Sequence, residues 1–156
     1  MKINQTLALA LSLFGFTLAS TAVMAEDANK HSAAVSEAEA DPMFEGYAAV
    51  STALYKDDLA AAKLAATGIV KQDKDSAMVK HAQGIADSKD LDEARMHFKE
   101  LSDAAIPVAK AEKTMHRMHC PMAMDGKGAD WLQASADEVQ NPYMGAAMPH
   151  CGKVVK

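Results

Sequence analysis

The chain has 156 residues, a formal net charge of −5 and an aromatic content of 5%. Nucleic-acid binding requires a basic face, so this charge argues against nucleic acid as a partner. Because aromatic residues are few, the core must be built mainly from Ala, Leu, Val, Ile and Met side chains.

The first 25 residues have the layout of a secretory signal peptide. Lys2 provides a positive start, an apolar stretch follows, and Val23 and Ala25 fit the −3 and −1 positions of a cut before Glu26. The apolar stretch is shorter than the ~20 residues of a membrane-spanning helix, although an uncleaved anchor is the alternative. We therefore expect residues 1–25 to be removed on export, leaving a periplasmic protein with no membrane span.

Residues 26–40 are rich in Ala, Glu and Ser without apolar periodicity, which predicts a flexible leader. Residues 41–156 are expected to form a single domain. Apolar residues at helical spacing predict four helices, at about 42–54, 59–70, 77–85 and 91–105. Asp41 before Pro42 is a typical N-cap, and Asp90 with Glu93 resembles a capping box.

Four amphipathic helices joined by short polar breaks favour a mainly α fold, an antiparallel up-and-down four-helix bundle. No convincing alternation of period two occurs before residue 110, so strands should be minor or absent there. We expect an irregular C-terminal segment, rich in Met, His and Cys, packed on this bundle. Trp131 is predicted to pack that segment on the helices. Asn141-Pro142-Tyr143 is typical of a turn with an aromatic anchor.

Potential soft-metal ligands are concentrated in the C-terminal segment, at about 114–152. Beyond residue 25 there are 17 Met, His and Cys residues, and eleven of them lie between 115 and 151. Thiolate and thioether sulfur prefer soft ions such as copper(I), and imidazole is acceptable to copper. Zinc is less favoured because no Cys pair has the usual C-x₂₋₄-C spacing. The candidate ligands are Cys120, Met122, Met148, Cys151, His116, His119, Met124 and His150.

Each candidate also has a plain structural interpretation. Two cysteines in an exported protein form a disulfide by default, so disulfide and metal ligation both stay open for Cys120 and Cys151. The methionines could fill a core poor in aromatic residues, and the histidines could be exposed. Met96 and His97, on the fourth predicted helix, are expected to be ordinary helix residues.

The chain also resembles a bacterial family of exported domains of unknown function. The resemblance rests on Cys120-Pro121-Met122-Ala123 and on Asn141-Pro142-Tyr143-Met144-Gly145-x-x-Met148-x-x-Cys151-Gly152. Similar sequences are fused to periplasmic adaptor subunits of copper/silver efflux pumps. The resemblance covers roughly residues 43–155 and implies periplasmic heavy-metal binding, with Cys120, Met122, Met148 and Cys151 at the matching positions.

The function predicted from the sequence is therefore that of a non-enzymatic copper(I)-binding protein of copper homeostasis, with silver as the other candidate ion. It would buffer the ion or pass it to an efflux adaptor or another copper-handling protein. The alternative is an exported, disulfide-stapled helical bundle that binds a protein partner without metal. An enzyme is not expected, because no Ser-His-Asp arrangement, defensible carboxylate pair or C-x-x-C motif is present.

Overall fold

The computed structural model describes residues 41–72, 76–109 and 115–155. The predicted signal peptide, 1–25, and the predicted leader, 26–40, lie outside the described residues. No helix in the described ranges has the length and apolar character needed to cross a membrane.

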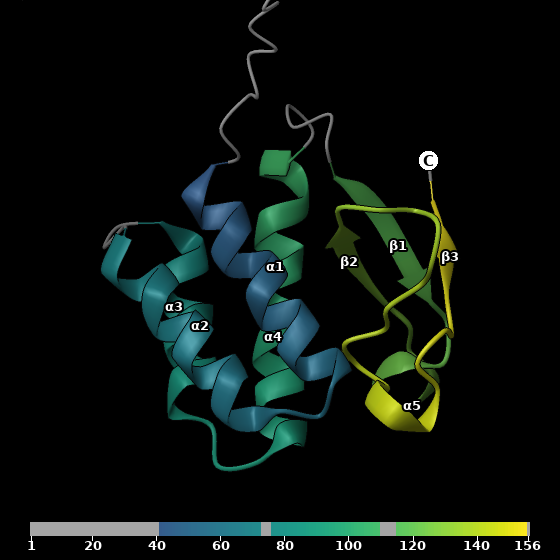
Figure 1. The fold of residues 1–156 in the computed structure, drawn as a ribbon, viewed down its shortest axis with the longest axis horizontal. Coiled ribbons are helices and arrows are strands. Elements are labelled where there is room, and N and C mark those ends of the chain that lie inside the picture. Colours follow the sequence, from purple (N-terminus) through teal and green to yellow (C-terminus); the bar gives the residue numbers. More distant parts are fainter. Residues whose placement is uncertain (1–40, 73–75, 110–114, 156) are drawn as a thin grey trace, which may run out of the picture. The chain divides into compact units, whose positions relative to one another are not determined.

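Four long helices make up the first part of the described chain: α1 (Pro42–Tyr55), α2 (Leu59–Gln72), α3 (Ala77–Asp87) and α4 (Leu91–Val108). Each packs against the next, and α4 also contacts α1 and α2 (Figure 1). The prediction of a mainly helical protein with four helices is therefore confirmed. The helical stripes supply most of the core, including Phe44, Tyr47, Val50, Leu54, Ala62, Ala66, Ile69, Met78, Ala82, Ile85, Ala94, Phe98 and Leu101.

Local capping explains where α1 and α4 begin. The Asp41 carboxylate accepts the Met43 N–H at 2.9 Å. The Asp90 carboxylate accepts the Glu93 N–H at 2.9 Å, and Glu93 in turn accepts the Lys89 N–H at 2.8 Å. Caps of this kind stabilise a helix by about 1 kcal/mol each. Helix α4 continues through Pro107, where we expected it to have ended, because a proline in the last turn removes only one backbone hydrogen bond.

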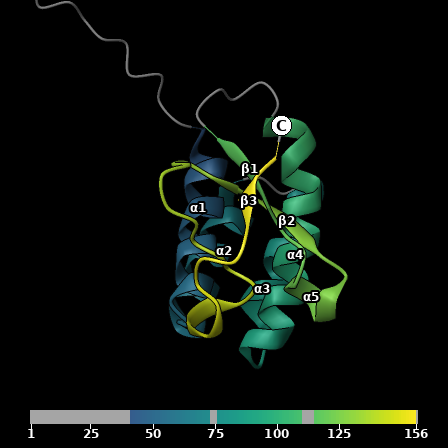
Figure 2. The same cartoon turned by 90° about the vertical axis from the view of Figure 1, so that its right-hand side faces the viewer.

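The C-terminal segment is not irregular, as the sequence had suggested, but contains a three-stranded sheet. Its strands are β1 (His116–Cys120), β2 (Ala129–Gln133) and β3 (Lys153–Val154), in the order β2-β1-β3 with antiparallel pairing. Two short elements, α5 (Ala123–Gly126) and the 3₁₀ helix η2 (Gly145–Ala147), lie in the connections. The sheet lies beside α1 and α4, with β2 packed on α4 (Figures 1 and 2).

A buried polar network joins the helices to this sheet. The Tyr47 hydroxyl of α1 lies 2.7 Å from Ser102 Oγ of α4 and accepts the Leu132 N–H of β2 at 3.1 Å. The Tyr143 hydroxyl donates to the Asp130 carbonyl at 2.7 Å and lies 3.3 Å from the same Ser102 oxygen. Burial raises the pKa of both phenols well above the usual value, so both stay protonated. Trp131 is fully buried, and its ring meets that of Tyr143 edge-on, with the ring centres 6.0 Å apart.

Candidate functional site

The two cysteine sulfurs meet at the end of the sheet. Cys120 Sγ and Cys151 Sγ lie 2.8 Å apart, and both cysteines are free thiols in the structure. The β1–β3 register explains this meeting, because His119 pairs with Lys153. One further step along the antiparallel register brings Gly152 opposite Cys120 and leaves Cys151 beside the end of β1.

The environments of the two thiols differ. Cys120 is fully buried, on the same face of β1 as Met118, whereas Cys151 is half-buried. The adjacent Cys120 thiol, followed by burial, raises the pKa of Cys151, although the Met122 backbone N–H partly opposes this. Because Cys151 is the more exposed of the two, solvent reaches the thiol pair from the side of Cys151.

Asn141 holds the chain that carries Cys151. Its side chain is fully buried and donates from Nδ2 to the Cys151 carbonyl at 2.6 Å. Its Oδ1 accepts the N–H groups of Tyr143 at 2.9 Å and Met144 at 3.1 Å. One side chain thus fixes both the 141–144 turn, which the sequence predicted, and the position of Cys151.

Gly152 allows the chain to pass close to the core after Cys151. A Cβ at this position would stand 2.7 Å from Trp131 Cη2 and 3.1 Å from the His119 carbonyl oxygen, and its φ is +144°. A side chain here would therefore force Cys151 and β3 away from β1.

A second anchor, which the sequence did not reveal, holds the loop after Tyr143. Arg95 donates from Nε to the Pro142 carbonyl at 3.0 Å and forms an ion pair with Asp57. Asp57 also accepts the Ala146 N–H at 3.0 Å, and this hydrogen bond is the largest cause of its lowered pKa.

Two predicted thioether ligands flank the thiols in the chain. Met122 follows Cys120 by two positions and is 55% exposed, while Met148 is 38% exposed, and its carbonyl accepts the Cys151 N–H at 3.2 Å. Met122 also lines a hollow, described below, that it shares with Met124 of α5.

The predicted histidine ligands are not gathered at the thiols. His116 lies at the opposite end of β1 from Cys120, about 13 Å along the strand at ~3.3 Å per residue. His150 Nδ1 lies 2.8 Å from the Val139 carbonyl, to which it donates as the Nδ1–H tautomer, and its ring centre is 6.5 Å from that of Tyr55. In the described ranges, no group of three His, Cys, Asp or Glu side chains forms a metal-binding cluster.

His119 instead belongs to a polar cluster on the opposite face of β1 from Cys120. Its Nδ1 lies 2.6 Å from Asp130 Oδ1, and Arg117 Nε donates to Asp130 Oδ2 at 2.9 Å. Burial alone would raise the pKa of Asp130, but the hydrogen bonds from Arg117 and His119 outweigh it and lower this pKa. Neighbouring residues of a strand point to opposite faces, so the His119 ring does not face the Cys120 thiol.

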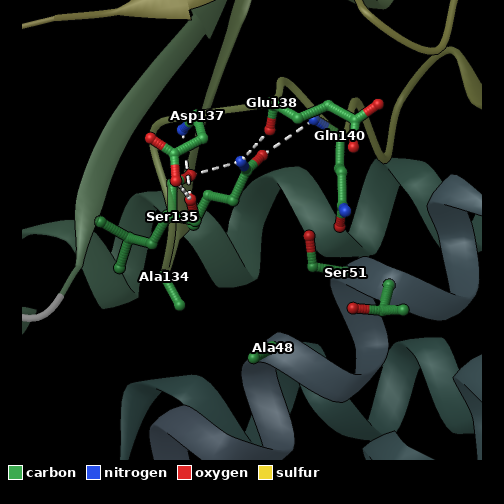
Figure 3. A pocket seen from close by; sticks show the side chains of 10 residues that line it. Ala48, Ser51, Ala134, Ser135, Asp137, Glu138 and Gln140 are labelled. Carbon is green, nitrogen blue, oxygen red and sulfur yellow. Dashed lines mark hydrogen bonds between the residues drawn. The ribbon is translucent and has the colours of Figure 1, made fainter.

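A hollow of about 360 Å³ lies between α1 and the chain after β2 (Figure 3). Ala48 and Ser51 of α1 line one side, and Ala134, Ser135 and Gln140 line the other. The Gln133 amide closes the loop by donating to the Ser135 carbonyl at 2.6 Å. Its small and polar lining does not offer soft ligands, so we place the candidate site at the cysteines.

Comparison of the chain with known protein families, with curated proteins and with solved structures finds no match.

Proposed function

We propose that this protein binds a soft metal ion in the periplasm, copper(I) or silver(I), and buffers it or passes it to an efflux system. One observation carries this proposal: Cys120 and Cys151, 31 positions apart, lie with their sulfurs 2.8 Å from each other. Two thiols, with the thioethers of Met122 and Met148 close to them in the chain, offer the donor types that soft ions prefer. The same proposal includes export of the protein to the periplasm and its relation to the family of exported domains that it resembles.

The thiols must separate to hold one ion between them. With metal–sulfur bonds of about 2.3 Å, two sulfurs on one metal lie about 3.8 Å apart in tetrahedral geometry and about 4.6 Å apart in linear geometry. The present separation is 2.8 Å, so loading requires a movement of at least about 1 Å. Cys151 is the half-buried partner and lies in a loop, so we assign the movement to it. The four helices, which we interpret as an up-and-down bundle, form the rigid support.

The proposed role is non-enzymatic, and its test is an affinity measurement. The reduced, full-length protein is titrated anaerobically with copper(I) in competition with a chromophoric chelator. Replacing Cys120, Met122, Met148 and Cys151 together should weaken binding by more than about 100-fold, since loss of outer-shell partners alone costs 10–100-fold. Met43→Leu, on α1, is the control. Equal affinities for the fourfold variant and the wild type would refute the proposal.

The same distance favours a second candidate, a disulfide-stapled module that binds a protein partner without metal. Closing this loop would stabilise the fold by about 3–4 kcal/mol in the chain-entropy model. Intact mass with and without reductant, together with metal content after gentle purification, distinguishes the two functions. A disulfide that persists at the periplasmic redox poise, with no bound copper, favours the stapled module.

A further inference from the structure

Four methionines from separate parts of the chain line one hollow of about 350 Å³. Met96 comes from α4, Met122 and Met124 come from the α5 turn, and Met144 comes from the loop after Tyr143. We call this hollow the methionine cleft. Its lining residues are Asp92, Arg95, Met96, Met122, Met124, Asp125, Tyr143 and Met144.

These methionines differ from those that fill the core. Met78 and Met118 are 3% and 0% exposed, whereas Met96 and Met122 are 57% and 55% exposed. Met124 and Met144 are half-buried. Leaving a long apolar side chain in water forfeits about 1.5–3 kcal/mol of burial free energy, so core filling does not explain the exposed pair. Both exposed residues line the hollow.

The charges around the cleft favour a cation. Two acidic residues, Asp92 and Asp125, line it. The only basic lining residue is Arg95, whose guanidinium is already paired with Asp57 and donates to the carbonyls of Leu54 and Pro142. The two carboxylates therefore leave the cleft with net negative charge.

The backbone of the α5 turn is strained where it enters the cleft. Met124 and Asp125 have φ values of +54° and +57°, the left-handed region that non-glycine residues rarely occupy. Each such residue costs about 1–2 kcal/mol and persists only where surrounding structure holds it. Here the turn brings the side chains of Met122, Met124 and Asp125 to one hollow.

We propose that the methionine cleft is a second site for a soft monovalent cation, copper(I) or silver(I), bound by thioether sulfur and separate from the thiol pair. The inference shares with the proposed function only the class of ion. Met96, which the sequence assigned to an ordinary helix face, and Met144 become ligands. Thioethers do not titrate, so binding in the cleft should be nearly independent of pH, whereas binding to the thiols releases protons.

The test uses silver(I) in chloride-free buffer, because silver(I) is soft and does not change oxidation state. A Cys120→Ala/Cys151→Ser variant of the full chain removes the thiol site. It should still bind one silver ion by native mass spectrometry, with the same affinity at pH 6 and pH 8. Adding Met96→Leu, Met124→Leu and Met144→Leu should abolish that binding. These exchanges conserve volume and are expected to preserve the fold.

The wild-type protein with ¹³C-labelled methionine methyl groups provides a second readout that needs no substitution. Two equivalents of silver(I) at pH 6, enough to fill both proposed sites, should shift the methyl signals of Met96, Met124 and Met144, while the core methyls of Met78 and Met118 stay in place. Unshifted cleft methyls, or undiminished binding by the leucine variant, would overturn the cleft proposal. Failure of the thiol site gives a different result: proton release on loading is absent while cleft binding persists.

Discussion

Replacing Asn141 by Ala tests whether one buried amide positions Cys151. The change removes the hydrogen bond to the Cys151 carbonyl and the two bonds from the Tyr143 and Met144 N–H groups. Each contributes about 1 kcal/mol net, so we expect a loss of about 3 kcal/mol in the free energy of unfolding. This is a large share of the roughly 5–15 kcal/mol typical of a domain, and urea denaturation of the reduced protein measures it.

A matched pair of variants separates the three bonds. Asn141→Asp keeps both acceptor bonds but places a carboxylate oxygen against the Cys151 carbonyl, where the amide donated at 2.6 Å. We expect an intermediate loss of stability at pH 7 and a partial recovery in acid, when the carboxyl is protonated and donates again. Gln140→Ala is the control and should change the free energy of unfolding by less than about 0.5 kcal/mol.

The same variants predict a chemical effect at the thiols. Once the Cys151 carbonyl is released, the two sulfurs spend less time together, so disulfide formation with oxidised glutathione should be slower in Asn141→Ala than in wild type. A variant with wild-type stability and wild-type oxidation rate would show that the amide does not hold the site, and the account of its assembly given above would fail.

Three further predictions concern neighbouring features. Gly152→Ala should destabilise the fold by about 1–3 kcal/mol and weaken metal affinity at the thiols, since the new Cβ meets Trp131. Gly126→Ala, also at positive φ but with open space around it, should lower stability without weakening metal binding at the thiols. Asp57→Asn should destabilise the protein at pH 7. Because folding lowers the pKa of Asp57, its contribution is lost as the pH falls through that lowered value, so both proteins should have similar urea midpoints in strong acid. Cys120→Ala should lower the pKa of Cys151, because the hydrogen bond between the two thiols, which is the main cause of the raised pKa, is removed. The pH profile for alkylation of Cys151 by iodoacetamide should therefore move to lower pH.

The helices were predictable because their signals are local. Asp41, Asp90 and Glu93 lie within four residues of the N–H groups that they cap, and each apolar stripe repeats within a single element. The strands were not predictable in the same way. Strand β3 pairs with β1 at two positions only, and the paired residues are about 35 positions apart in the sequence. Strand β1, His116–Cys120, consists mostly of possible metal ligands and does not alternate clearly between apolar and polar residues.

The candidate site was predictable in composition but not in grouping. The sequence showed that the Met, His and Cys residues are concentrated between positions 115 and 151, and the structure brings the sulfurs of Cys120 and Cys151 together. The sequence could not show that the His119 ring would contact Asp130, because strand pairing decides which face of the sheet each residue occupies. The role of Arg95 depends on contacts with Asp57 and Pro142, 38 and 47 positions away, which no local pattern encodes.

The contacts of Tyr47, Ser102 and Tyr143 have a consequence for how ion loading could be followed. They tie α1 and α4 to β2, so separating the sheet from the helices would break these hydrogen bonds and expose the apolar side chains packed around them to water. The two layers should therefore melt together, as one cooperative transition. An ion bound only at the sheet would then raise the melting temperature of the distant helices, and helical circular dichroism would report its occupancy. A peptide excised from residues 115–155 would lose that support and is a poor substitute for the whole chain.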